Sequence, residues 1–133
     1  MTKIAIIGSR SFNDYDLMVK FIEVWGTGVP TEVISGGAPG ADSLGERFAA
    51  EHGLPVTIFH ADWERYGKAA GIIRNTDIID AADIVFAFWD GKSPGTKDSI
   101  KKAMSRAKTL FVCRYLDRDT KLNIATIEHL YDE

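Results

Sequence analysis

Short apolar runs rich in β-branched residues alternate with segments of helical periodicity from one end of the chain to the other. This alternation limits the fold more than any other feature. Buried strands are predicted at 3–7, 31–35, 55–59, 83–88 and 109–113, and helices between them at 14–25, 39–53, 68–81 and 99–107. Such an order predicts a parallel sheet with helices on both faces. We therefore expect an α/β fold with three layers, α/β/α, around a parallel sheet of about five strands.

Two regions outside this regular pattern carry their own predictions. Residues 61–67 are expected to form a loop, and helix 68–81 is expected to turn Ile72 and Ile79 inward. The length fits one domain, which we place at residues 1–115. The tail, residues 116–133, is expected to end in a short helix that packs on the same domain.

Composition argues against several classes of protein. The single cysteine, Cys113, rules out an internal disulfide and a cysteine-rich metal site. His52, His60 and His129 show no metal-ligand spacing, so neither a metal nor a cofactor is expected. The formal net charge of −3 disfavours broad nucleic-acid binding, which needs a basic face. The chain shows no signal-peptide pattern and no apolar run near the roughly 20 residues that span a bilayer, so a cytoplasmic location without membrane contact is expected.

Glycines and polar residues collect directly after the predicted strands. In open α/β sheets, ligands bind beyond the carboxyl ends of the strands, near the point where the strand order reverses. Four such segments follow strands of this chain, at 8–12, 35–42, 62–66 and 89–96. Because all four are expected at one edge of the sheet, the sequence predicts a ligand site there.

The segment 35–42, SGGAPGAD, is the strongest single signal. The N–H groups of Gly36 and Gly37 can approach a phosphate closely, and the N-terminus of the following helix carries about half a positive charge. Asp42, in the first turn of that helix, is expected either to cap the backbone or to accept hydrogen bonds from ligand hydroxyls. The alternative is a tight turn in which the glycines serve geometry alone.

The segment 93–96, SPGT, again places small residues and hydroxyls where a helix begins. The alternative for this segment is a plain helix start, with Ser93 as N-cap and Pro94 at the first helical position. Arg10 is suited to a forked contact with a phosphate or carboxylate, and its alternative role is a surface ion pair.

Aromatic and helical residues complete the predicted site. Trp63, Tyr66 and Trp89 are candidates for stacking on a base, with packing in the core or a lid as the alternative. Arg74 and Asn75 fall off the apolar stripe of their helix, and periodicity leaves open whether they face ligand or solvent. The ligand-binding candidates are Gly8, Ser9, Arg10, Phe12, Ser35, Gly36, Gly37, Ala38, Gly40, Ala41, Asp42, Asp62, Trp63, Arg74, Asn75, Trp89, Asp90, Gly91, Ser93, Gly95 and Thr96.

These motifs, in this order, resemble the SLOG superfamily, which groups the LOG nucleotide phosphoribohydrolases with the DNA-processing protein A. The resemblance is to its small stand-alone YspA/YpsA-related branch and runs from about residue 3 to residue 113. It rests on GSR at 8–10, SGGAPGAD at 35–42, ADWERYGKAAG at 61–71 with RN at 74–75, and DGKSPGT at 90–96. It implies a Rossmann-like fold, a pocket for nucleotides or nucleotide-derived molecules, and pocket positions for Arg74 and Asn75.

The same resemblance does not assign a catalytic residue. The LOG enzymes carry the motif PGGxGTxxE, whose glutamate acts in cleaving the bond between base and ribose phosphate. The corresponding position here, three after Thr96, is Ser99, and Asp98 would point about 100° away around a helix. Asp42, Asp90 and Asp98 are the candidate catalytic carboxylates, with Asp62 as a further carboxylate near the expected site.

Three functions are compatible with these residues. The first is a binding module that senses a nucleotide or a nucleotide-derived signal. The second is a hydrolase that cleaves the N-glycosidic bond of a nucleoside monophosphate. The third, which the acidic balance disfavours, is binding of single-stranded DNA through aromatic stacking. The tail and the relatives in the superfamily also suggest a homodimer or a higher homo-oligomer.

Overall fold

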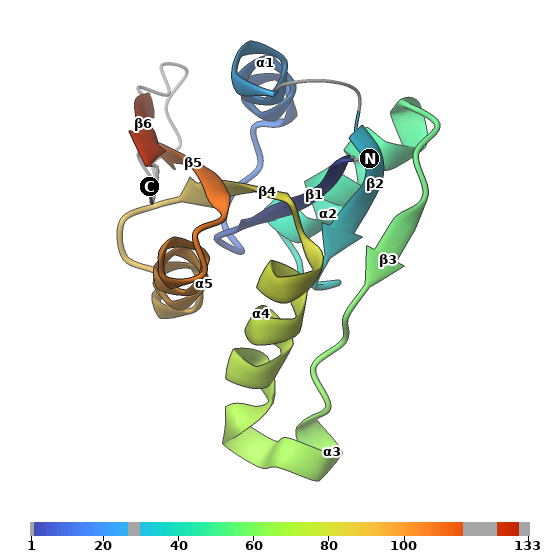
Figure 1. Cartoon of the computed structure of the whole chain (residues 1–133), viewed down its shortest axis with the longest axis vertical. Coiled ribbons are helices and arrows are strands. Elements are labelled where there is room, and N and C mark those ends of the chain that lie inside the picture. Colours follow the sequence, from blue (N-terminus) through green and yellow to red (C-terminus); the bar gives the residue numbers. More distant parts are fainter. Residues whose placement is uncertain (1, 27–29, 116–124, 131–133) are drawn as a thin grey trace.

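A six-stranded sheet with the strand order β3-β2-β1-β4-β5-β6 forms the centre of the computed structural model (Figure 1), which describes residues 2–26, 30–115 and 125–130. The strands β1 (Thr2–Gly8), β2 (Pro30–Ser35), β3 (Val56–Ile58), β4 (Ile84–Trp89) and β5 (Thr109–Tyr115) all run parallel. This confirms the predicted α/β fold with a five-stranded parallel sheet. The order grows from β1 in both directions, so the topological switch point lies between β1 and β4.

Helices cover both faces of the sheet. Helices α1 (Tyr15–Trp25) and α2 (Ala41–Glu51) pack on one face, where Phe21 and Phe48 belong to one buried cluster. Helices α4 (Ala70–Ala81) and α5 (Pro94–Ser105) pack on the other face, where Ile79 and Ile100 belong to a second cluster. Because side chains alternate along each strand, Ile6 of β1 enters the first cluster and Ile7 the second. The result is the three-layer Rossmann-like arrangement.

The tail differs from its prediction. Residues Ala125–Leu130 form a strand, β6, which pairs antiparallel with β5 from Leu110↔Leu130 to Tyr115↔Ala125. The predicted short helix is therefore wrong over these residues. An edge strand presents a row of unpaired N–H and C=O groups, and pairing β6 with β5 satisfies the row that β5 would otherwise expose. The rest of the predicted tail lies outside the described residues.

The predicted loop at 61–67 is also wrong, because part of it is helical. Helix α3 (Trp63–Tyr66) begins after Asp62, whose carboxylate accepts a hydrogen bond from the N–H of Arg65 at 3.1 Å. A 3₁₀ turn (Gly67–Ala69) then leads into α4. Aspartate at an N-cap starts a helix even where the residues that follow show no helical period.

Helix α4 extends past the sheet, and α3 lies at its far end (Figure 1). Its buried residues are Ala70, Ile78 and Ile79, whereas Ile72 is 56% exposed. The inward orientation predicted for Ile72 is therefore wrong, while that of Ile79 is confirmed. The predicted inward face therefore holds only toward the C-terminal end of the helix, because its first turns extend past the sheet (Figure 1).

Helix α5 begins at Pro94, earlier than the predicted start at residue 99, and Ser93 occupies the N-cap position. Proline suits the first helical position because its fixed φ is already helical and its missing N–H is not needed there. Helix α2 instead begins at Ala41, after the predicted residue 39, with Gly40 as its N-cap at φ 82°. Among the described residues, no helix is long and apolar enough to cross a bilayer.

Candidate functional site

A pocket of about 560 Å³ opens at the carboxyl edge of the sheet, next to the switch point between β1 and β4. This volume lies in the usual range for small-molecule sites. The predicted residues that line it are Gly8, Ser9, Arg10, Ala38, Asp42, Trp63, Arg74, Asn75, Asp90, Ser93, Gly95 and Thr96. The predicted residues outside the lining are Phe12, Ser35, Gly36, Gly37, Gly40, Ala41, Asp62, Trp89 and Gly91.

Ser9 joins the loops that surround the pocket. It is buried, and its N–H donates to the carbonyl of Phe88 at 2.9 Å, which continues the pairing of β1 with β4. Its carbonyl accepts from the N–H of Ala41 at 3.2 Å, and its hydroxyl accepts from the N–H of Asp90 at 3.2 Å. Phe12, by contrast, is buried against Phe88, with ring centroids 4.9 Å apart, and is a core residue. Arg10 is exposed in the pocket lining.

The loop 35–42 directs its own N–H groups inward. The N–H of Gly37 donates to the hydroxyl of Ser35 at 3.2 Å, and the N–H of Ala38 donates to the carboxylate of Asp42 at 3.2 Å. The carbonyl of Gly36 accepts from the guanidinium of Arg74 at 2.7 Å. A Cβ on Gly36 would lie 2.7 Å from the Asp42 carboxylate and 2.9 Å from this guanidinium, so a larger residue would displace one of these side chains. Hydrogen bonds to Asp42 thus close the loop, and its carboxylate lines the pocket.

Asp42 is the buried carboxylate of the pocket, with 7% of its surface exposed. Burial raises its pKa to about 6, although hydrogen bonding from Ala38 and the charge of Arg74 act in the opposite direction. A carboxyl group with a pKa of about 6 can hold or release a proton near neutral pH. Asp42 is therefore a pocket carboxyl group whose pKa lies near neutral pH.

The loop 90–96 is braced by Asp90. Its carboxylate accepts from the N–H groups of Lys92 and Ser93, each at 2.8 Å, and from the Ser93 hydroxyl at 3.1 Å. Partial burial alone would raise the pKa of Asp90, but these hydrogen bonds outweigh it and lower the pKa below its ordinary value. The indole of Trp89 donates to the carbonyl of Ser93 at 3.1 Å, and the guanidinium of Arg114 lies 5.5 Å above its ring. Asp90 and Trp89 thus hold this loop in shape.

The first turn of α5 faces the pocket without a side-chain cap. The Ser93 hydroxyl donates to Asp90 and accepts no capping bond from the helix. Thr96 and Ser99, one turn apart, are 7% and 4% exposed and both line the pocket. Within the described part of the chain, neither hydroxyl has a hydrogen-bond partner. Neither hydroxyl oxygen is fully buried, so both reach the space of the pocket and are available to a group that enters it.

The α3–α4 side supplies charge and aromatic surface. Trp63 is 56% exposed at the pocket mouth and packs close to Gly71, where a Cβ would lie 3.6 Å from the indole. Lys68 lines the same side. Asp98 lies outside the lining, and its carboxylate pairs with the Lys102 ammonium at 2.8 Å.

The sequence did not indicate several lining residues, and Ser99 is the most informative of them. Recognition of a helix start at Pro94 would place Ser99 one turn beyond Thr96 and on the same face. The other missed residues are Ile7, Ser11, Lys68, Gly71, Ile72, Ile78 and Pro94.

Together, the parallel sheet, its switch point and a polar pocket over a helix N-terminus define a Rossmann-like α/β domain with a pocket at the carboxyl edge of its sheet. The model of one family, described as the YspA, cpYpsA-related SLOG family, matches residues 2–66, and the chain belongs to this family. The Gene 61 protein of Mycobacterium phage D29 is similar to the chain, with 35% identity over 113 residues that cover 77% of this chain and 89% of the relative. Membership of the family points to nucleotide-related binding or processing.

Proposed function

We propose that the chain is a binding module for a nucleotide or a nucleotide-derived phosphorylated molecule, with the phosphate at the first turn of α5. The observation that carries this proposal is the pair of hydroxyls of Thr96 and Ser99, which line the pocket at the start of α5 and have no hydrogen-bond partner among the described residues. A phosphate oxygen accepts hydrogen bonds from hydroxyls and from the N–H groups of an uncapped helix N-terminus. Gly95 and Thr96 provide such N–H groups in α5.

The charged residues of the pocket lining also support a phosphorylated ligand. Arg10, Lys68 and Arg74 all line the pocket and favour an anionic ligand. The exposed indole of Trp63 offers a face for a base at the pocket mouth. Asp42 suits hydroxyl groups of the ligand, because a carboxylate accepts hydrogen bonds and repels a second phosphate.

A calorimetric titration against adenosine 5′-monophosphate (AMP), the other nucleoside monophosphates, ATP, adenosine and inorganic phosphate tests the proposal. We expect binding of at least one phosphorylated compound and none of adenosine at the same concentration. A ligand at 100 times its dissociation constant should stabilise the fold by about 2.7 kcal/mol in a thermal-shift measurement. Binding of adenosine as strongly as AMP, or of no phosphorylated compound, contradicts the proposal.

One observation favours hydrolysis as a second candidate function. Asp42 is buried in the pocket with a pKa of about 6, which is suited to general acid–base catalysis. In such a reaction the water oxygen bonds to C1′ of the ribose, the bond from C1′ to the base nitrogen breaks, and the base leaves with a proton. Chromatography of nucleoside monophosphates after incubation would detect the free base. Asp42→Asn should abolish product while AMP binding persists, and the absence of free base from every nucleotide would leave the binding module alone.

A further inference from the structure

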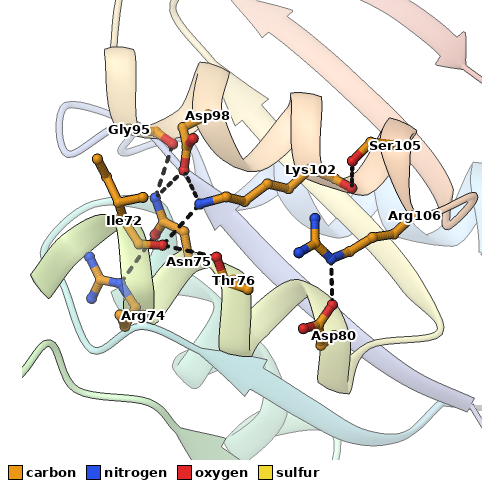
Figure 2. Close-up of polar contacts among 10 residues, drawn as sticks. All are labelled: Ile72, Arg74, Asn75, Thr76, Asp80, Gly95, Asp98, Lys102, Ser105 and Arg106. Carbon is orange, nitrogen blue, oxygen red and sulfur yellow. Dashed lines mark hydrogen bonds and ion pairs between the residues drawn. The ribbon is translucent and has the colours of Figure 1, made fainter. Parts of the chain in front are cut away.

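A series of side-chain contacts links α5 to Arg74 of α4 (Figure 2), and Arg74 in turn contacts the loop 35–42. The Lys102 ammonium pairs with Asp98 at 2.8 Å, and Asp98 accepts from the Asn75 amide at 3.3 Å. The amide oxygen of Asn75 accepts from the Arg74 Nε–H at 3.2 Å, and another nitrogen of that guanidinium donates to the carbonyl of Gly36 at 2.7 Å. These contacts connect the interface between two helices to a cation of the pocket.

Asn75 is the branching point of this series. Its amide nitrogen donates to the carbonyl of Gly95 at 3.3 Å as well as to Asp98, so both of its N–H groups have acceptors. The amide group is planar, and therefore one orientation of Asn75 fixes both the first turn of α5 and the Nε–H of Arg74. Although Asn75 lines the pocket, its donors are directed at the protein.

The ion pair between Asp98 and Lys102 anchors that orientation. Its side chains are 32% and 17% exposed, so solvent screens it less than a fully exposed pair. The Lys102 ammonium also donates to the carbonyl of Ile72 at 2.9 Å, which ties α5 to the backbone of α4. A second ion pair, Arg106 with Asp80 at 2.6 Å, joins the same two helices further along and shares no residue with this series (Figure 2).

We infer that Asn75 and Asp98 are positioning residues, which hold Arg74 and the first turn of α5 in one fixed arrangement around the ligand. The part that concerns the ligand rests on the proposed function, whereas the orientation of Arg74 does not. With its Nε and one terminal nitrogen engaged, Arg74 keeps the rest of its guanidinium for the pocket. Asp98 thereby acts on ligand binding from outside the pocket lining.

The side-chain Nε–Hε signal of Arg74 in a ¹H–¹⁵N spectrum of the full chain tests this inference without a ligand. Its assignment follows from the signal that disappears in Arg74→Lys. In Asp98→Ala we expect this signal to shift and its hydrogen exchange to become about tenfold faster, because the acceptor is no longer held. Asp80→Ala is the matched control, since it also removes an ion pair between α4 and α5, and it should leave the signal unchanged.

Two further variants separate orientation from general loosening of the fold. Asp98→Asn keeps an acceptor for the Asn75 amide and should restore most of the native signal. Lys102→Met gives an independent measurement should Asp98→Ala unfold, and it should shift the Arg74 signal in the same direction. An unchanged Arg74 signal in Asp98→Ala, or an equal change in Asp80→Ala, would overturn the inference.

Binding of AMP supplies the second readout. We expect Asp98→Ala to bind AMP about tenfold more weakly than the unmodified chain, and Asp80→Ala to bind within about twofold. Equal affinities of the two variants would contradict the role in ligand binding. If the unmodified chain binds no phosphorylated compound, the proposed function fails, and the Arg74 signal still decides whether Asn75 and Asp98 fix its orientation.

Discussion

The two glycine-containing loops at the carboxyl edge, 35–42 and 90–96, each lead from a strand into a helix, and neither helix has a side-chain cap. In both loops an aspartate accepts hydrogen bonds from backbone N–H groups, Asp42 from Ala38 and Asp90 from two residues of its own turn. The loops differ in the group that lines the pocket. The first, which we call the closed loop, presents the carboxylate of Asp42, whereas the second, which we call the open loop, presents hydroxyls of α5 that have no partner among the described residues. Glycine content alone therefore does not identify a phosphate site, because the pocket-lining groups distinguish the two loops.

The largest expected effect is a difference in stability between the alanine variants of two glycines, one from each loop. A Cβ on Gly40, at φ 82°, would clash with the carbonyl oxygens of Ser9 and Arg10. We expect Gly40→Ala to lower the free energy of unfolding by about 3 kcal/mol or more, measured by urea denaturation. Gly95 has nothing within 4 Å of its Cβ position, so Gly95→Ala should raise stability by about 0.5–1 kcal/mol. Similar losses of unfolding free energy in both variants would contradict the difference in backbone crowding between these two glycines.

The second prediction uses the opposite pKa shifts of the two carboxylates. Burial raises the pKa of Asp42 to about 6, above its value in the unfolded chain, so the folded state prefers the protonated form. The contribution of Asp42 to stability is therefore highest below about pH 4, falls as the pH rises to about 6, and is constant above. Relative to Asp42→Asn, the unmodified chain should lose about 2–3 kcal/mol between about pH 4 and pH 7 in urea denaturation at each pH.

Asp90 provides the control of opposite sign. Partial burial opposes its ionisation, but hydrogen bonds from Ser93 and Lys92 lower its pKa, so the folded state prefers the charged form. Its contribution is present above the unfolded pKa and is lost as the pH falls through the lower folded pKa. Relative to Asp90→Asn, the unmodified chain should therefore lose stability only as the pH falls toward acid, and the difference between the two should be constant above the unfolded pKa. Parallel pH profiles for the two variants would contradict the environments assigned to these carboxylates.

The third prediction concerns the open loop and separates stability from binding. Ser99→Ala and Thr96→Val remove pocket-lining hydroxyls that have no partner among the described residues, so the free energy of unfolding should stay within about 0.5 kcal/mol of that of the unmodified chain. AMP binding, measured by calorimetry, should weaken about tenfold. Ser105→Ala, on the same helix, removes a hydroxyl that donates to Lys102 and should leave binding unchanged. Unchanged AMP affinity in both pocket variants would place the phosphate elsewhere.

The sequence is sufficient for the five parallel strands, but not for β6, and for the edge of the sheet where the pocket lies. Strand β4 is a continuous apolar run because both of its faces are covered, and the polar segments follow the strands, so their common edge is predictable. The predicted Arg74 indeed lies in the pocket lining.

What the sequence could not show depends on side-chain orientation. Nothing in SGGAPGAD reveals that Asp42 folds back onto the N–H of Ala38, because that contact exists only once the loop is closed. The residues of SPGT are typical of loops and of helix starts alike; the structure confirms the alternative given for them, with Ser93 at the N-cap and Pro94 at the first helical position. Ser99 is not among the predicted ligand-binding residues. Arg74 and Asn75 are adjacent in the sequence, yet the contacts around Asn75 belong to the helix interface.

The smallest expected effect concerns Trp63, an aromatic side chain that comes from neither loop. If the phosphate lies at α5 and the base lies at the pocket mouth, Trp63→Leu should weaken AMP binding about threefold to fivefold, because leucine keeps apolar contact but loses stacking. Binding of inorganic phosphate should not change, since the indole lies on the α3 side of the pocket. Tyr66→Leu is the matched control, because Tyr66 is 40% exposed on α3 and lies outside the lining. A loss of AMP and phosphate affinity in equal measure would mean that α3 shapes the anion site itself, and the open loop would then not be sufficient for phosphate binding.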